Sequence, residues 1–130
     1  MSFSSKGAVI LIIDEEECIR DSCCQVLIKA GYRVETAING EAGLAKVKEI
    51  EPDVALVDLD MPGVSGLEVM GRLNEVSPGT VRIVVTGHTS IDLEKEIIRK
   101  GRALAYLTKP FSPEQLNIVV RKALDSRNKT

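Results

Sequence analysis

Five side chains that could act together in chemistry follow apolar segments of this 130-residue sequence. They are the carboxylates Asp14, Glu15 and Asp58, the hydroxyl of Thr86 and the ammonium of Lys109. Carboxylates that are brought together repel one another, and a divalent cation that prefers oxygen ligands relieves the repulsion. Mg²⁺ fits best, because it binds through one or two protein carboxylates and keeps places for water or a phosphoryl oxygen.

The acid at position 58 ends the apolar stretch VALVD, residues 54–58. A carboxylate that closes a buried strand is costly to desolvate unless a cation or hydrogen bonds compensate it, which favours a functional site. If Asp58 attacked phosphorus it would form an aspartyl phosphate, and a metal ion, Thr86 and Lys109 could neutralise the transferring group. We therefore predict Asp58 as the nucleophile.

Strands and helices that alternate along the chain must position these groups. Apolar runs rich in β-branched residues predict five strands, at 8–13, 32–37, 54–58, 81–86 and 103–107. Helical patterns predict helices near 19–30, 42–48, 67–73, 91–100 and 113–124, with a turn at Asn39-Gly40 before the second and a Ser112/Gln115 capping box before the last. Such alternation predicts an α/β fold with parallel strands and helices on both faces of the sheet. The carboxyl ends of the strands then meet at one edge, where ligands collect in such folds.

Length and charge narrow the class of protein. A chain of 130 residues suits one domain, and a net charge of −2 gives no general attraction to nucleic acid or to an anionic membrane. The longest apolar run, 8–13, is too short to span a bilayer, and the start lacks the apolar core of a signal peptide, so we expect a cytoplasmic protein.

The cysteines, at positions 18, 23 and 24, suggest reduced thiols. A zinc site that they would form with His88 is disfavoured, because adjacent cysteines on a helix point about 100° apart.

Four blocks of sequence carry a family resemblance: IIDEE at 12–16, DLDMPGVSG at 58–66, VTGH at 85–88 and YLTKPF at 106–111. In this order they resemble the response-regulator receiver domain of two-component signalling, over residues 8–124. The resemblance implies a CheY-like, flavodoxin-like (βα)5 three-layer sandwich with strand order 2-1-3-4-5. It places a receiver domain at 8–126, between tails at 1–7 and 127–130.

The resemblance also implies roles for individual residues at the site. Asp58 would accept a phosphoryl group from the phosphohistidine of a kinase. Mg²⁺ would be held by Glu15, Asp58 and the main-chain carbonyl of Asp60, with Asp14 acting through metal-bound water. Glu15 stands where the family more often has Asp, so we expect a shifted metal geometry or a weaker affinity.

Further roles concern the response to phosphorylation. Lys109 would pair with the phosphoryl group, and its bond to Pro110 is expected to be cis. Thr86 would swing to the phosphoryl group, and Tyr106 would turn inward once Thr86 has moved. Asp60 and His88 would tune the lifetime of the phosphoryl group, and we hypothesise that they flank the path of the hydrolytic water.

The expected partners are a sensor histidine kinase or phosphotransfer protein, and an output domain or effector that binds the face of the fourth helix, fifth strand and fifth helix. The chain would be a monomer or a weak homodimer, with no direct contact with nucleic acid or membrane. It would be a signalling domain that phosphorylates and dephosphorylates only itself. Two alternatives remain: a pseudo-receiver that serves only for docking, and an aspartate-nucleophile phosphatase, which the DLD motif also resembles.

Overall fold

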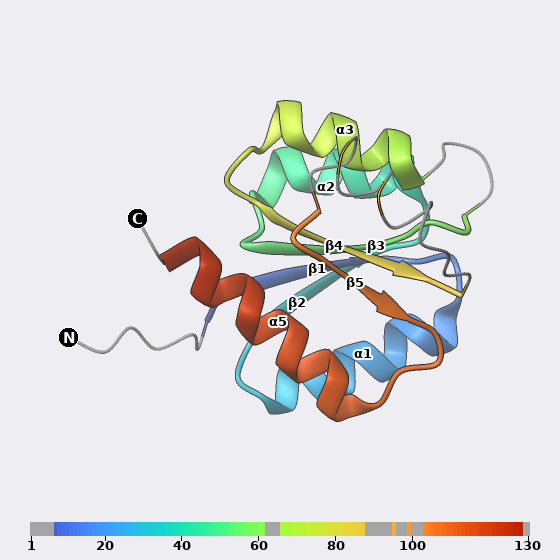
Figure 1. Ribbon diagram of the computed structural model, residues 1–130, viewed down its shortest axis with the longest axis vertical. Helices are drawn as coiled ribbons and strands as arrows, with labels where there is room; N and C mark the ends of the chain where they lie inside the picture. The colour runs from blue at the N-terminus through green and yellow to red at the C-terminus, as the bar shows by residue number, and fades with distance from the viewer. Residues whose placement is uncertain (1–6, 62–65, 88–94, 96–98, 100–102, 129–130) are drawn as a thin grey trace.

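The computed structural model describes residues 7–61, 66–87, 95, 99 and 103–128 (Figure 1). Its elements are β1 (Val9–Ile13), α1 (Glu17–Lys29), β2 (Arg33–Ala37), α2 (Gly40–Ile50), β3 (Val54–Asp58), α3 (Gly66–Val76), β4 (Val81–Thr86), β5 (Ala105–Thr108) and α5 (Pro113–Asn128). The helix predicted at 91–100 lies outside the described residues, apart from positions 95 and 99.

The five strands form one parallel sheet in the order β2-β1-β3-β4-β5. This confirms the predicted flavodoxin-like topology. Because β1 pairs with both β2 and β3, the strand order reverses there, and ligands bind beside such a point at the carboxyl edge of a sheet. Figure 1 shows α2 and α3 covering one face of the sheet, and α1 and α5 covering the other.

Alternating side chains of the central strands fill two hydrophobic cores. On β1, Ile10 and Ile12 belong to the core beneath α1 and α5, whereas Leu11 and Ile13 belong to the core beneath α2 and α3. All five residues of β3 are buried, as expected for a central strand that is covered on both faces. The carboxyl end of β3 is therefore packed between the two cores.

Local sequence signals set several element boundaries. Ser112 Oγ accepts a hydrogen bond from the Gln115 N–H, and the Ser112 N–H donates to Gln115 Oε1, which confirms the predicted capping box of α5. The Asn39-Gly40 turn is in fact the start of α2, where Asn39 Oδ1 accepts from the Ala42 N–H. The fifth strand begins at Ala105, two residues later than predicted.

No helix in the described part of the chain is long and apolar enough to cross a membrane.

Candidate functional site

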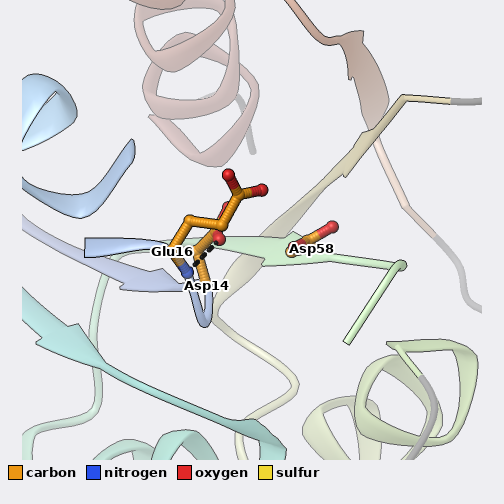
Figure 2. A group of neighbouring side chains, drawn as sticks. All are labelled: Asp14, Glu16 and Asp58. Atoms are coloured by element: carbon orange, nitrogen blue, oxygen red, sulfur yellow. Dashed lines mark hydrogen bonds between the residues drawn. The ribbon is translucent and has the colours of Figure 1, made fainter. Parts of the chain in front are cut away.

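Three carboxylates meet at the carboxyl edge of the sheet (Figure 2). Asp14 follows β1, Asp58 ends β3, and Glu16 lies just before α1. One carboxylate oxygen from each of them lies within 4.8 Å of the others. The parallel register pairs Ile13 with Val57, so Asp14 and Asp58, which follow them, emerge side by side.

The short connection between β1 and α1 orients the first two of these acids. The Glu16 N–H donates to Asp14 Oδ1 at 2.9 Å, and the guanidinium of Arg20 donates to the Asp14 carbonyl at 2.8 Å. Glu16 is the N-cap residue of α1, yet its side chain makes no capping hydrogen bond. The Glu16 carboxylate lies with the other two acids instead.

The ammonium of Lys109 lies among the three carboxylates. Its Nζ is 3.1 Å from Asp14 Oδ2, 3.2 Å from Glu16 Oε1 and 3.3 Å from Asp58 Oδ2. The Lys109 N–H donates to the Thr86 carbonyl at 2.9 Å, which ties this lysine to the end of β4. The Lys109-Pro110 peptide bond is cis, as predicted.

Burial and charge shift the pKa values of two groups in this cluster. Burial raises the pKa of Asp58, with the Asp14 charge adding to the rise, while the hydrogen bond from the Asp60 N–H and the charge of Lys109 oppose it. Burial lowers the pKa of Lys109, but hydrogen bonds and charges from Asp14, Asp58 and Glu16 outweigh it and raise the pKa above its ordinary value. The lysine therefore stays charged, and Asp58 is a carboxylate of raised proton affinity.

The donor set fits a hard divalent cation. Its ligand atoms are all carboxylate oxygens, which Mg²⁺ prefers, and two of the acids, Asp14 and Asp58, are buried. The cluster already surrounds one positive charge, the Lys109 ammonium, at contact distances. The residues therefore suit a cation bound through Asp14, Glu16 and Asp58.

Glu15, which the sequence predicts as a metal ligand, has a different place. Both Glu15 and Glu16 are exposed, but only Glu16, which sequence reasoning did not select, belongs to the three-acid cluster. A signal was present in the run Glu15-Glu16-Glu17, but the direction of each acid depends on the turn between β1 and α1. Side chains of adjacent residues point in different directions, so one step along this turn decides whether a carboxylate joins the cluster.

The residues predicted to respond to phosphorylation are Thr86, Tyr106, Asp60 and His88. Thr86 is buried at the end of β4, and Tyr106 is half-buried on β5, where it pairs in register with Val84. Asp60 is exposed, and its side chain accepts a hydrogen bond from the Gly87 N–H at 3.0 Å. His88 lies outside the described residues.

Comparisons with known proteins agree on one family. The sequence profile of the response regulator receiver domain matches residues 10–121. The chain is 32% identical over 115 residues to sporulation initiation phosphotransferase F of Bacillus subtilis, covering 88% of this chain and 92% of that protein. It is 31% identical to regulatory protein AtoC of Escherichia coli, covering 88% of this chain but only 25% of that longer protein.

A solved structure shares the fold over almost the whole chain. The crystal structure of a CheY-like response regulator receiver domain protein from Methanospirillum hungatei superposes with a TM-score of 0.89 and 34% sequence identity, covering 95% of this chain and 98% of that one. This agreement in sequence, in fold and in strand order shows that the chain belongs to the response regulator receiver domain family of two-component signalling.

Proposed function

We propose that Asp58 is the phosphoacceptor of this receiver domain. The observation that carries the proposal is the buried Asp58 carboxylate at the carboxyl end of the central strand, 3.3 Å from Lys109 and beside two further acids. An Asp58 oxygen would attack the phosphorus of a phosphohistidine, and the bond from phosphorus to the imidazole nitrogen would break. Lys109 supports this role because its ammonium can offset the negative charge that gathers on the phosphoryl oxygens.

We further propose that the domain works with Mg²⁺, held by Asp14, Glu16 and Asp58. When bound, the ion supplies positive charge that neutralises phosphoryl oxygens. Glu16 enters this ligand set in place of Glu15, because its carboxylate lies in the cluster and that of Glu15 does not. The main-chain carbonyl of Asp60 remains a proposed ligand from the family resemblance.

The remaining roles are proposed from the same resemblance. Thr86 would respond to the phosphoryl group and Tyr106 would follow it, which their places at the end of β4 and on the adjoining β5 support. Asp60 and His88 would tune the lifetime of the phosphoryl group. The domain would act in the cytoplasm, its upstream partner would be a sensor histidine kinase or a phosphotransfer protein, and the output would be a domain or effector that contacts the face around β5 and α5.

The test is the intact mass of the protein after incubation with acetyl phosphate. We expect one phosphoryl adduct in the presence of Mg²⁺, and none with EDTA or in Asp58→Asn. Asp21→Asn is a matched control, since Asp21 is an exposed acid on α1 away from the cluster, and this variant should be phosphorylated like the wild type. If folded wild type takes up no phosphate, the phosphoacceptor role is wrong and a docking-only receiver becomes the better description.

A further inference from the structure

The side chain of Asp60 connects the phosphoacceptor loop to the end of the neighbouring strand. The main-chain N–H of Asp60 donates to Asp58 Oδ1 at 2.9 Å, while its carboxylate Oδ2 accepts from the N–H of Gly87 at 3.0 Å. Gly87 directly follows Thr86, the last residue of β4. One residue therefore touches both the Asp58 carboxylate and the chain that leaves β4.

Gly87 lies where the support from the sheet ends. Up to Thr86 the main chain is held on both sides, because the Leu59 N–H donates to the Val85 carbonyl and the Lys109 N–H donates to the Thr86 carbonyl, both at 2.9 Å. Gly87 is the first residue beyond these bonds, it is exposed, and as a glycine it has wide backbone freedom. The bond to Asp60 thus restrains the main chain at a point where the sheet no longer does.

The charge of Asp60 makes this restraint sensitive to Asp58. A phosphoryl group would replace the single negative charge on Asp58 with a larger one and add oxygens beside the Asp60 N–H. Like charges repel, and a hydrogen bond between exposed groups is weak enough for such repulsion to displace it. The Asp60 carboxylate would then move away from Asp58 and lose the Gly87 N–H.

We propose that Asp60 is an electrostatic latch for the end of β4. In the unphosphorylated protein its carboxylate holds Gly87, and negative charge that arrives on Asp58 releases it. Holding is a property of the unphosphorylated chain, whereas release rests on the proposed phosphorylation of Asp58. Asp60 is in this view a positioning residue that acts on the strand end through Gly87.

Two variants of Asp60 separate the hydrogen bond from the charge. Asp60→Ala removes both, whereas Asp60→Asn keeps an oxygen that can accept from Gly87 and removes the charge. The readout is the amide signal of Gly87 in ¹⁵N-labelled protein. In Asp60→Ala we expect this amide proton to shift upfield and to exchange with solvent at least about tenfold faster, while the amide of Val85 within β4 stays unchanged. An unchanged Gly87 amide in Asp60→Ala would refute the latch.

Release is tested on the same samples with acetyl phosphate and Mg²⁺, and intact mass reports the phosphoryl group in each. In phosphorylated wild type we expect the Gly87 amide to move toward its position in Asp60→Ala. In phosphorylated Asp60→Asn it should move less than half as far. Equal movement in both proteins would show that charge on Asp60 does not drive release.

A wild type that takes up no phosphate would overturn the proposed function, while the comparison of unphosphorylated Asp60→Ala with wild type would still decide whether Asp60 holds Gly87.

Discussion

Replacing Asp58 by asparagine should make the protein more stable, because Asp58 is a buried charge and the attraction and repulsion from its charged neighbours nearly cancel. Lys109 Nζ lies 3.3 Å from Asp58 Oδ2, an attraction of about 5 kcal/mol at an effective dielectric constant of about 20. Asp14 has an oxygen within 4.8 Å of Asp58 and repels it by about 3.5 kcal/mol on the same scale. Glu16 is half exposed, so screening reduces its repulsion to about 1 kcal/mol.

The cost of burying the carboxylate then decides the sign. The attraction and the repulsions on Asp58 cancel to within about 1 kcal/mol, and the Asp58 side chain is only 2% exposed. Asparagine has nearly the same shape and can still accept from the Asp60 N–H, but it carries no charge. We therefore expect Asp58→Asn to raise the free energy of unfolding by about 1 to 2 kcal/mol at neutral pH in EDTA.

The pH dependence tests this reasoning separately. Burial raises the pKa of Asp58 above its ordinary value of 3.8. Between the ordinary pKa and the raised pKa of the folded state, the folded wild type binds more protons than the unfolded chain. The stability of the wild type therefore falls as the pH rises through this window. The advantage of Asp58→Asn should thus be small near pH 3.8, grow through the acid range and level off above the raised pKa.

The measurement is urea denaturation followed by far-ultraviolet circular dichroism at several pH values, with Asp21→Asn as the exposed control. That control should change the free energy of unfolding by less than about 0.5 kcal/mol. If Asp58→Asn is less stable than wild type at neutral pH, attraction to Lys109 outweighs desolvation and the reasoning is refuted. A gain that does not depend on pH would mean that packing, and not the charge, is responsible.

Three further predictions follow from the same structure. Glu16→Gln should weaken Mg²⁺ binding about tenfold and Glu15→Gln less than about twofold by calorimetric titration; the reverse order would return the ligand role to Glu15. Gly66→Ala should lower the free energy of unfolding by about 2 to 3 kcal/mol in urea denaturation, because its Cβ would lie 2.6 Å from the Leu59 Cα. Gly71→Ala on the same helix has open space around its Cβ and should raise the free energy of unfolding by about 0.5 kcal/mol. Burial, with the Asp14 charge, raises the pKa of Cys23 to about 12. Iodoacetamide should therefore leave Cys23 unmodified at about pH 8 until urea unfolds the chain. Rapid labelling of Cys23 in the folded protein would contradict this.

The sequence was sufficient for the elements and for most of the site edge. Apolar strands that alternate with helical patterns permit few arrangements other than a parallel sheet covered on both faces, so all five described strands could be predicted. Because the carboxyl ends of parallel strands share one edge, Asp14, Asp58 and Lys109 could be placed together before any coordinates. The fourth helix and His88 lie outside the described residues and remain predictions.

Only the tertiary structure decided which of the neighbouring acids lies in the carboxylate cluster. The sequence offers Glu15, Glu16 and Glu17 in a row, and composition and spacing treat them alike. The turn after β1 directs Glu16 toward Lys109 and keeps Glu15 out of the carboxylate cluster, because a side chain's direction depends on the backbone angles of that turn. The Asp60 contact with Gly87 has the same origin, since it joins residues 27 positions apart that meet only when β3 pairs with β4. Sequence determined the chemistry available at this edge, and the packing of the strands determined which side chains can use it.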